Sequence, residues 1–158
     1  MVQLDYSDQS TVPAVKGGLA DSGHHDIASR ASATTIAFGV GLAINTTGFV
    51  LVPTATGFKF EGVAMLKQKA PPNTTGIALY DIGEEISVLR QGRIYVTAEV
   101  AVNPTLAVFL RHTVNAALTP GDFRIDADTA RADQITNAKW VSTTTTGPLL
   151  AILEVNSP

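Results

Sequence analysis

From Thr34 to Val155 the chain repeats one local pattern, in which a short β-rich run is followed by a turn signal. The runs are rich in Val, Ile, Leu, Phe and Thr, whereas Gly, Pro, Asn and Asp gather in the stretches between them. Runs at this spacing are typical of a sandwich or a barrel. The sequence therefore predicts an all-β fold, with a sandwich or barrel-like body of the jelly-roll or a related type. The predicted strands are TTIAFGVGLAI, FVLVP, FKFEGVAMLK, EISVLR, GRIYVTAEVAV, LAVFLRH, DFRIDA, AKWVST and PLLAILEV.

The clearest of these strands is GRIYVTAEVAV, because its apolar residues recur at every second position. Ile94, Val96, Ala98 and Val100 fall on one side, and the intervening residues Arg93, Tyr95, Thr97 and Glu99 fall on the other. Successive side chains of a strand point to opposite faces of the sheet, so one face is buried and the other is wet. We expect Ile94, Val96 and Val100 to be core residues.

Three further expectations concern the C-terminal part of the chain. The final run is apolar at both alternating sets of positions from Leu149 to Leu153, which predicts a strand that is buried on both faces. Trp140 should be buried, with its indole N–H bound to an acceptor. Helix is expected only within residues 126–133, as one or two turns with Asp126 or Asp128 as the N-cap.

Residues 1–33 differ from the rest of the chain. They are polar, they contain Pro13 and the pair Gly17 and Gly18, and they show no sustained apolar period. The pattern predicts an extended N-terminal arm over residues 1–33 and a β-rich body over residues 34–158.

Composition excludes several classes of protein. The 158 residues suffice for one domain, and the absence of cysteine excludes disulfides and thiolate sites. A net charge of −3 and the lack of any Lys/Arg cluster argue against nucleic acid as a partner. No run approaches 18 apolar residues, so no membrane partner is predicted, and without a signal-peptide pattern we expect synthesis in the cytoplasm of the producing cell.

The stretch LADSGHHDIASR, residues 19–30, gathers the residue types that catalysis and metal binding use. His24 and His25 are neighbours, so in an extended chain they point to opposite sides and cannot readily share one metal ion. Ser22, a histidine and Asp26 would form a triad compressed into five residues, whereas such groups normally converge from distant strands or loops. The alternatives to a metal site and a triad are a polar loop and an interface segment.

Other candidate motifs do not meet their own patterns. Asp126 and Asp128 begin like a calcium loop, but Arg131 stands where that loop requires glycine. Glu84 and Glu85 are adjacent in a turn before a strand, which is ordinarily a solvated edge. The sequence therefore predicts no catalytic residue, no metal site and no cofactor, and a protein that works by binding.

Several segments, taken in order, resemble the structural cement, or head decoration, proteins of tailed bacteriophages. The resemblance covers roughly residues 13–156, and its most specific parts are the arm, the LR.GRI.V strand and the closing segment from Pro120 to Asn156. The chain departs from the expected pattern at His24 and His25, and at the stretch AVNPTLAVFL, where Pro104 would interrupt a strand. The segments that carry the resemblance are LADSGHHDIASR, TIAFGVGLA, FEGVAM, ISVLRQGRIYVTAEVAV and PGDFRIDADTARADQITNAKWVSTTTTGPLLAILEVN.

The resemblance implies a protein on the outer surface of the virion head that bridges neighbouring major capsid subunits and stabilises the shell against the pressure of packaged DNA. Its implied partners are the major capsid protein and other copies of itself, with a trimer favoured over a dimer. The residues expected at the capsid interface are Asp21, Ser22, His24, His25, Asp26, Ile27 and Arg30. Two alternatives stay open at this point, a carbohydrate-binding β-sandwich module and another virion component of the tail or neck.

Overall fold

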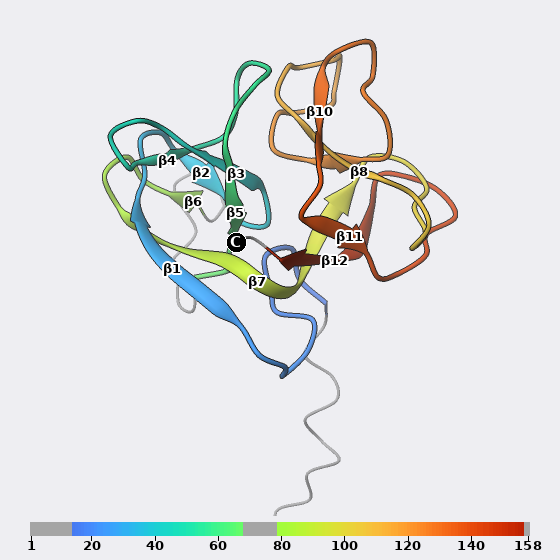
Figure 1. Cartoon of the computed structure of the whole chain (residues 1–158), viewed down its shortest axis with the longest axis horizontal. Helices are drawn as coiled ribbons and strands as arrows, with labels where there is room; N and C mark the ends of the chain where they lie inside the picture. The colour runs from blue at the N-terminus through green and yellow to red at the C-terminus, as the bar shows by residue number, and fades with distance from the viewer. Residues whose placement is uncertain (1–13, 68–78, 157–158) are drawn as a thin grey trace, which may run out of the picture.

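The computed structural model describes residues 14–67 and 79–156, and within these it contains strands and no helix (Figure 1). The prediction of an all-β fold is thus confirmed. The strands are β1 (Asp26–Ala31), β2 (Ile36–Ala37), β3 (Gly41–Ile44), β4 (Val50–Leu51), β5 (Phe60–Ala64), β6 (Leu79–Tyr80), β7 (Glu85–Ala98), β8 (Val108–Arg111), β9 (Phe123–Arg124), β10 (Ala132–Ile135), β11 (Ala138–Trp140) and β12 (Leu149–Asn156). In the described ranges, no helix is long and apolar enough to cross a membrane.

Strand β7 is the centre of the fold. Its 14 residues join two of the predicted runs into one strand, which pairs with β1, β5, β9 and β12. The main sheet follows the order β10-β8-β9-β7-β5-β3-β4, with β1 and β12 added on β7 and β11 added on β12. Strands β2 and β6 form a separate two-stranded sheet. Because β7 is long and bent, it carries one group of strands at each end (Figure 1).

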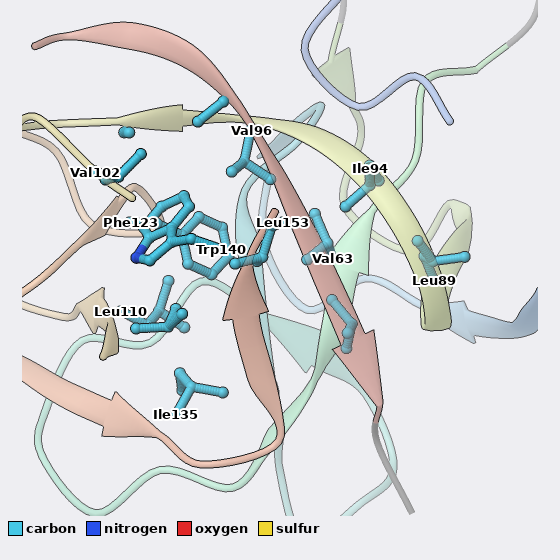
Figure 2. Close-up of a cluster of buried hydrophobic side chains, with 14 residues drawn as sticks. Val63, Leu89, Ile94, Val96, Val102, Leu110, Phe123, Ile135, Trp140 and Leu153 are labelled. Atoms are coloured by element: carbon cyan, nitrogen blue, oxygen red, sulfur yellow. The ribbon is translucent and has the colours of Figure 1, made fainter. Parts of the chain in front are cut away.

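Two clusters of buried side chains correspond to these two groups of strands. The smaller cluster includes Phe38 and Tyr80, whose rings meet edge to face at 5.2 Å. The larger cluster is drawn in Figure 2, where Trp140 and Phe123 lie at its centre with ring centroids 6.5 Å apart. Trp140 is 1% exposed and its Nε1–H donates to the carbonyl oxygen of Ala107 at 3.3 Å. The predicted burial of Trp140 is confirmed, together with a partner for its indole N–H.

The core assignments on β7 are confirmed for Ile94 and Val96, which are fully buried, but the assignment of Val100 is wrong. The strand ends at Ala98, and Val100 is only partly buried. Glu99 is buried instead, because its carboxylate pairs with two arginines. The alternation of buried residues therefore ends at Ala98, two residues before the end that the sequence pattern indicates.

The prediction that the last strand is buried on both faces is also wrong. On β12, Ala151, Leu153 and Val155 are buried, whereas Leu149 and Leu150 are 44% and 37% exposed. The strand pairs along β7 from Leu149 to Asn156, but its first two residues are exposed on both faces. Only the inner face of β12 is consequently packed.

The helical turns expected within residues 126–133 do not form. Asp128, Thr129 and Ala130 have positive φ values of 42°, 56° and 63°, so the chain turns with the opposite hand to an α-helix. Residues from Ala132 onward then form β10, which pairs with β8. Asp126 accepts the backbone N–H of Asp128 at 3.0 Å and thus stabilises this turn rather than a helix.

Part of the predicted arm lies in the main sheet. Strand β1 pairs antiparallel with β7 from Asp26↔Gln91 to Ala31↔Glu85, with an irregularity between Asp26 and Ile27. Further upstream, Gly17 N–H donates to the Tyr95 carbonyl at 2.8 Å. The described residues before Thr34 are therefore attached to the body by backbone hydrogen bonds. The separate function of residues 1–33 stays a prediction.

Candidate functional site

The residues expected at the interface lie along one edge of β7. Residues 17–20 bind β7 near Tyr95, the chain then loops outward over residues 21–25, and β1 rejoins β7 from Asp26 onward. Ala20 N–H donates to the Arg93 carbonyl at 2.9 Å, which holds the start of the loop. The loop is thus presented between two segments that are fixed to the same strand.

Asp21 organises the loop through three contacts. Its Oδ1 accepts the N–H of Gly23 at 3.1 Å and lies 3.2 Å from His25 Nε2. Its Oδ2 lies 3.5 Å from Arg93 Nε. The structure therefore brings Asp21 and His25 together and adds Arg93, which the sequence pattern did not indicate.

Arg93 connects the loop to a second ion pair on the neighbouring strand β12. Its Nε donates to Glu154 Oε2 at 2.8 Å, and Lys139 Nζ lies 2.8 Å from the other oxygen of the same carboxylate. The hydrogen bond from Lys139, assisted by that from Arg93, lowers the pKa of Glu154 to about 2. Glu154 is therefore ionised over the whole physiological range of pH.

A shallow hollow with a volume of about 290 Å³ lies beside these groups. His24 lines it, whereas the ring of His25 packs on the backbone of Gly92. The two histidines thus take different environments, as their adjacency in sequence implies. The residues that line the hollow are Asp21, Gly23, His24, Gln91, Gly92, Arg93, Glu154 and Asn156.

The remaining expected residues lie on or just before β1. Ser22, His24 and Asp26 are exposed, and Ile27 is 47% exposed although it is a large apolar residue. Arg30 differs, because its Nε and Nη2 donate to Glu61 Oε1 at 3.0 and 2.6 Å. Glu61 is buried, so this ion pair fixes β1 to β5. The exposed part of the candidate site is therefore residues 21–27. Arg30 instead makes a contact within the protein, to Glu61.

Sequence reasoning missed a second polar cluster, which is buried. Glu99 accepts hydrogen bonds from Arg111 at 2.5 and 2.8 Å and from Arg124 at 3.0 Å. Arg111 also donates to Asp128 at 2.7 Å, and its hydrogen bond with Glu99 raises the pKa of the guanidinium well above its ordinary value. The cluster joins β8 and β9 to the end of β7 and to the left-handed turn. The available signal was the presence of arginines inside apolar runs, in FLRH and in DFRID.

The arrangement suits binding through hydrogen bonds and ion pairs. In the part of the chain that the structure describes, no group of three or more His, Cys, Asp or Glu side chains is placed to hold a metal ion. The outer loop instead presents carboxylate, hydroxyl and imidazole groups next to the apolar side chain of Ile27. These groups sit on an all-β body whose described residues include no metal-binding cluster, an arrangement that suits a protein acting through surface contacts.

The comparison with protein families identifies which structural protein this is. Residues 2–156 match the model of the structural cement protein family (E217 gp24/Pam3 gp6). The chain belongs to this family, and it is a bacteriophage capsid cement, or decoration, protein. The family indicates a structural, non-enzymatic role in the virion capsid, in association with the shell.

The fold has a counterpart among solved structures. A chain described as "The capsid of Myoviridae Phage XM1" superposes with a TM-score of 0.70, and the match covers 94% of this chain and 96% of that one. The two sequences are 14% identical, so the likeness concerns the fold. No match was found among curated proteins.

Proposed function

We propose that the protein binds the outer surface of the phage head, bridges neighbouring major capsid subunits and stabilises the shell against the pressure of the packaged DNA. The observation that carries the proposal is the match of residues 2–156 to the structural cement family. Bridging reinforces a shell because each bound copy opposes the separation of the two subunits that it contacts. The protein is made in the host cytoplasm and is added to the head from outside.

The exposed segment 21–27 is the proposed shell contact. It carries Ser22, His24 and Asp26 as exposed polar groups and Ile27 as an exposed apolar group. Its flanks are fixed to β7 on both sides, so little conformational entropy is lost when the segment binds. Asp21, His25 and Arg30 support the segment through Arg93, Gly92 and Glu61 respectively.

Weak individual contacts suffice for this function. Copies that contact one another on a repeating lattice are bound multivalently, and effective concentration then multiplies their affinities. We propose that copies associate as trimers on the shell, in preference to dimers. Mass photometry measures the oligomeric state of the free protein, and copy counting on particles measures how many copies are bound to each head.

Co-sedimentation with undecorated heads tests the proposal. The wild-type protein should bind in hundreds of copies per head, on the order of the number of capsid subunits, because a shell of many subunits offers many equivalent sites. The variant Ser22→Ala/His24→Ala/Asp26→Ala should bind more weakly and keep its melting temperature. Thr145→Ala/Thr146→Ala, which changes exposed residues of the turn before β12, is the matched control and should bind like the wild type. Absence of wild-type binding, or binding in about a dozen copies, would contradict the proposal.

A further inference from the structure

Strand β1 has one edge that is paired with β7 and a second edge that, at Ile27 and Ser29, no strand of the described residues covers. On the paired side, Ser32 N–H donates to the Glu84 carbonyl at 2.9 Å and the Ser32 carbonyl accepts from Gly83 N–H at 2.9 Å. On the opposite side, Ala33 N–H donates to the Val50 carbonyl at 2.8 Å. Backbone groups of successive residues in a strand point to alternate edges, so even-numbered residues here face β7 and odd-numbered residues face away.

The register of β1 extends this alternation along the strand. Residues Ile27 to Ala31 pair with Leu89 to Glu85 without a break. The N–H and carbonyl groups of Ile27, Ser29 and Ala31 therefore point away from β7. Within residues 14–67 and 79–156, two carbonyl groups on that edge have partners. The Ala31 carbonyl takes part in the parallel bridge Ser32↔Val50 to β4, and the Ser29 carbonyl accepts from the guanidinium of Arg30 at 3.2 Å. No strand of the described residues pairs with the backbone of Ile27 or Ser29 on that side.

This edge has only part of the usual protection against pairing. Natural proteins protect edge strands with proline, with lysine or by covering them, because open N–H and carbonyl groups are a template for another strand. Strand β1 has no proline or lysine. Its protection consists of the charged Asp26, an irregularity between Asp26 and Ile27, and Arg30, whose guanidinium pairs with Glu61 and also meets the Ser29 carbonyl. Strand β4 already pairs with the following residues on the same side of the chain, through the bridge Ser32↔Val50 and the hydrogen bond from Ala33 N–H. The open part of the edge is therefore adjacent to a part that already pairs with another strand.

The surroundings of the edge offer contacts for the side chains of an added strand. A hollow with a volume of about 290 Å³ is lined by Ser29, Arg30, Ala31, Gly83 and Glu85. Glu85 is exposed and accepts a hydrogen bond from the Ser29 hydroxyl, so this face offers a carboxylate to a basic side chain. Ile27 offers an apolar contact at the other end of the same face, since residues 27, 29 and 31 share one side of the strand.

We propose that the open edge of β1, at the backbone groups of Ile27 and Ser29 and the N–H of Ala31, pairs with an extended segment of a capsid-shell subunit, which joins the sheet as an additional strand. The inference rests on the proposed function and specifies how the shell is held. Strand addition gains affinity from main-chain hydrogen bonds, and pockets for alternate side chains supply specificity. The shell segment should therefore be extended, with a Lys or Arg side chain placed to meet Glu85.

Hydrogen exchange tests the state of the edge in the wild-type protein. In the free protein, NMR should show fast exchange for the amides of Ile27, Ser29 and Ala31 and slow exchange for those of Ala28 and Arg30. After exchange on decorated heads, followed by quenching and release for NMR, the three outward amides should have become protected. Protection of these amides already in the free protein would show that the chain covers its own edge, and unchanged fast exchange on heads would show that the shell does not use it. Either result overturns the inference.

A proline substitution tests the same edge by binding. Ser29→Pro removes an outward N–H and leaves the inward hydrogen bonds of Ala28 and Arg30 in place, whereas Ser29→Ala removes only the hydroxyl. Binding to undecorated heads should weaken about tenfold or more for Ser29→Pro, and by less than about twofold for Ser29→Ala. Ala31→Pro, at the next outward position, serves as the second variant if Ser29→Pro melts far below the wild type.

The outcomes separate the inference from the proposed function. If the wild type does not bind heads, the proposed function fails. If the wild type and both proline variants bind equally, only the strand pairing fails. A free protein that is dimeric, and that becomes monomeric on Ser29→Pro, would assign the edge to a second copy and would contradict a shell segment as its partner.

Discussion

The imidazole ring of His25 packs directly on the backbone of Gly92, where a Cβ atom would stand 2.4 Å from His25 Cδ2. Gly92 also has a φ of 131°, a backbone conformation that residues other than glycine rarely adopt. The contact lies where β7 passes from its pairing with β1 to its pairing with β12. Both the close contact with His25 and the backbone conformation therefore require glycine at residue 92. The contact between His25 and Gly92 fixes the exposed loop to the central strand.

Replacing Gly92 with alanine should therefore destabilise the protein and displace His25. We expect Gly92→Ala to lower the free energy of unfolding by about 1–3 kcal/mol, from backbone strain and steric overlap together. Urea unfolding measures the loss of stability, and co-sedimentation with heads measures how far the displacement of the loop weakens binding. The control is Gly48→Ala, because Gly48 has a φ of 85° but no atom within 4 Å of its added Cβ. Equal losses for the two variants would show that the His25 contact contributes nothing.

The buried cluster around Glu99 predicts a large effect for Arg111. Both side chains are 0% exposed, so Arg111→Met would leave a buried carboxylate with Arg124 as its remaining close partner. Removing one member of a buried ion pair typically costs about 3–5 kcal/mol. Urea unfolding should show such a loss for Arg111→Met and a much smaller shift of the midpoint for Arg93→Met, whose side chain is 45% exposed. Similar shifts for the two variants would contradict the structural role of the cluster.

Trp140 provides a test of the larger core. Trp140→Ala removes the ring that packs against Phe123 and leaves the Ala107 carbonyl without its donor. A loss of about 3–5 kcal/mol is expected from the cavity alone. Phe49→Ala, at a residue that is 40% exposed, should cost far less. A loss below about 1 kcal/mol for Trp140→Ala would argue against its burial.

The ion pairs of Glu154 predict a dependence of stability on pH. Its pKa in the folded protein is about 2, below the ordinary 4.5, so the ionised carboxylate stabilises the fold above the unfolded pKa. That contribution should be lost as the pH falls from about 5 toward 2, the interval between the two pKa values. Glu154→Gln should be less stable than the wild type at pH 7, and urea midpoints of the two proteins should converge as the pH is lowered. A difference that does not depend on pH would show that the charge is not responsible.

The sequence predicted the all-β fold and part of the core, because alternation and turn residues are local signals. Ile94 and Val96 followed from period two alone. The pattern failed at Glu99, since the two arginines that bury this carboxylate come from strands much later in the chain. Local alternation carries no information about such a distant partner.

The candidate site was predicted as a contiguous segment, but the residues that hold this segment in place were not predicted. Asp21, His25 and Arg30 were selected from one stretch, whereas their partners Arg93, Gly92 and Glu61 are distant in sequence. Strand β1 was missed because DIASRA has one large apolar residue and is held mainly by backbone pairing with β7. The open edge of β1 becomes visible only once this pairing is known.

Cryo-EM of decorated heads tests the central claim most directly, since it locates each copy relative to the capsid subunits. The account predicts density for this protein on the outer surface of the head, in contact with at least two neighbouring subunits, with residues 21–31 at the contact. Density confined to the inner surface, to a single subunit or to the tail would contradict the claim that this protein bridges the shell.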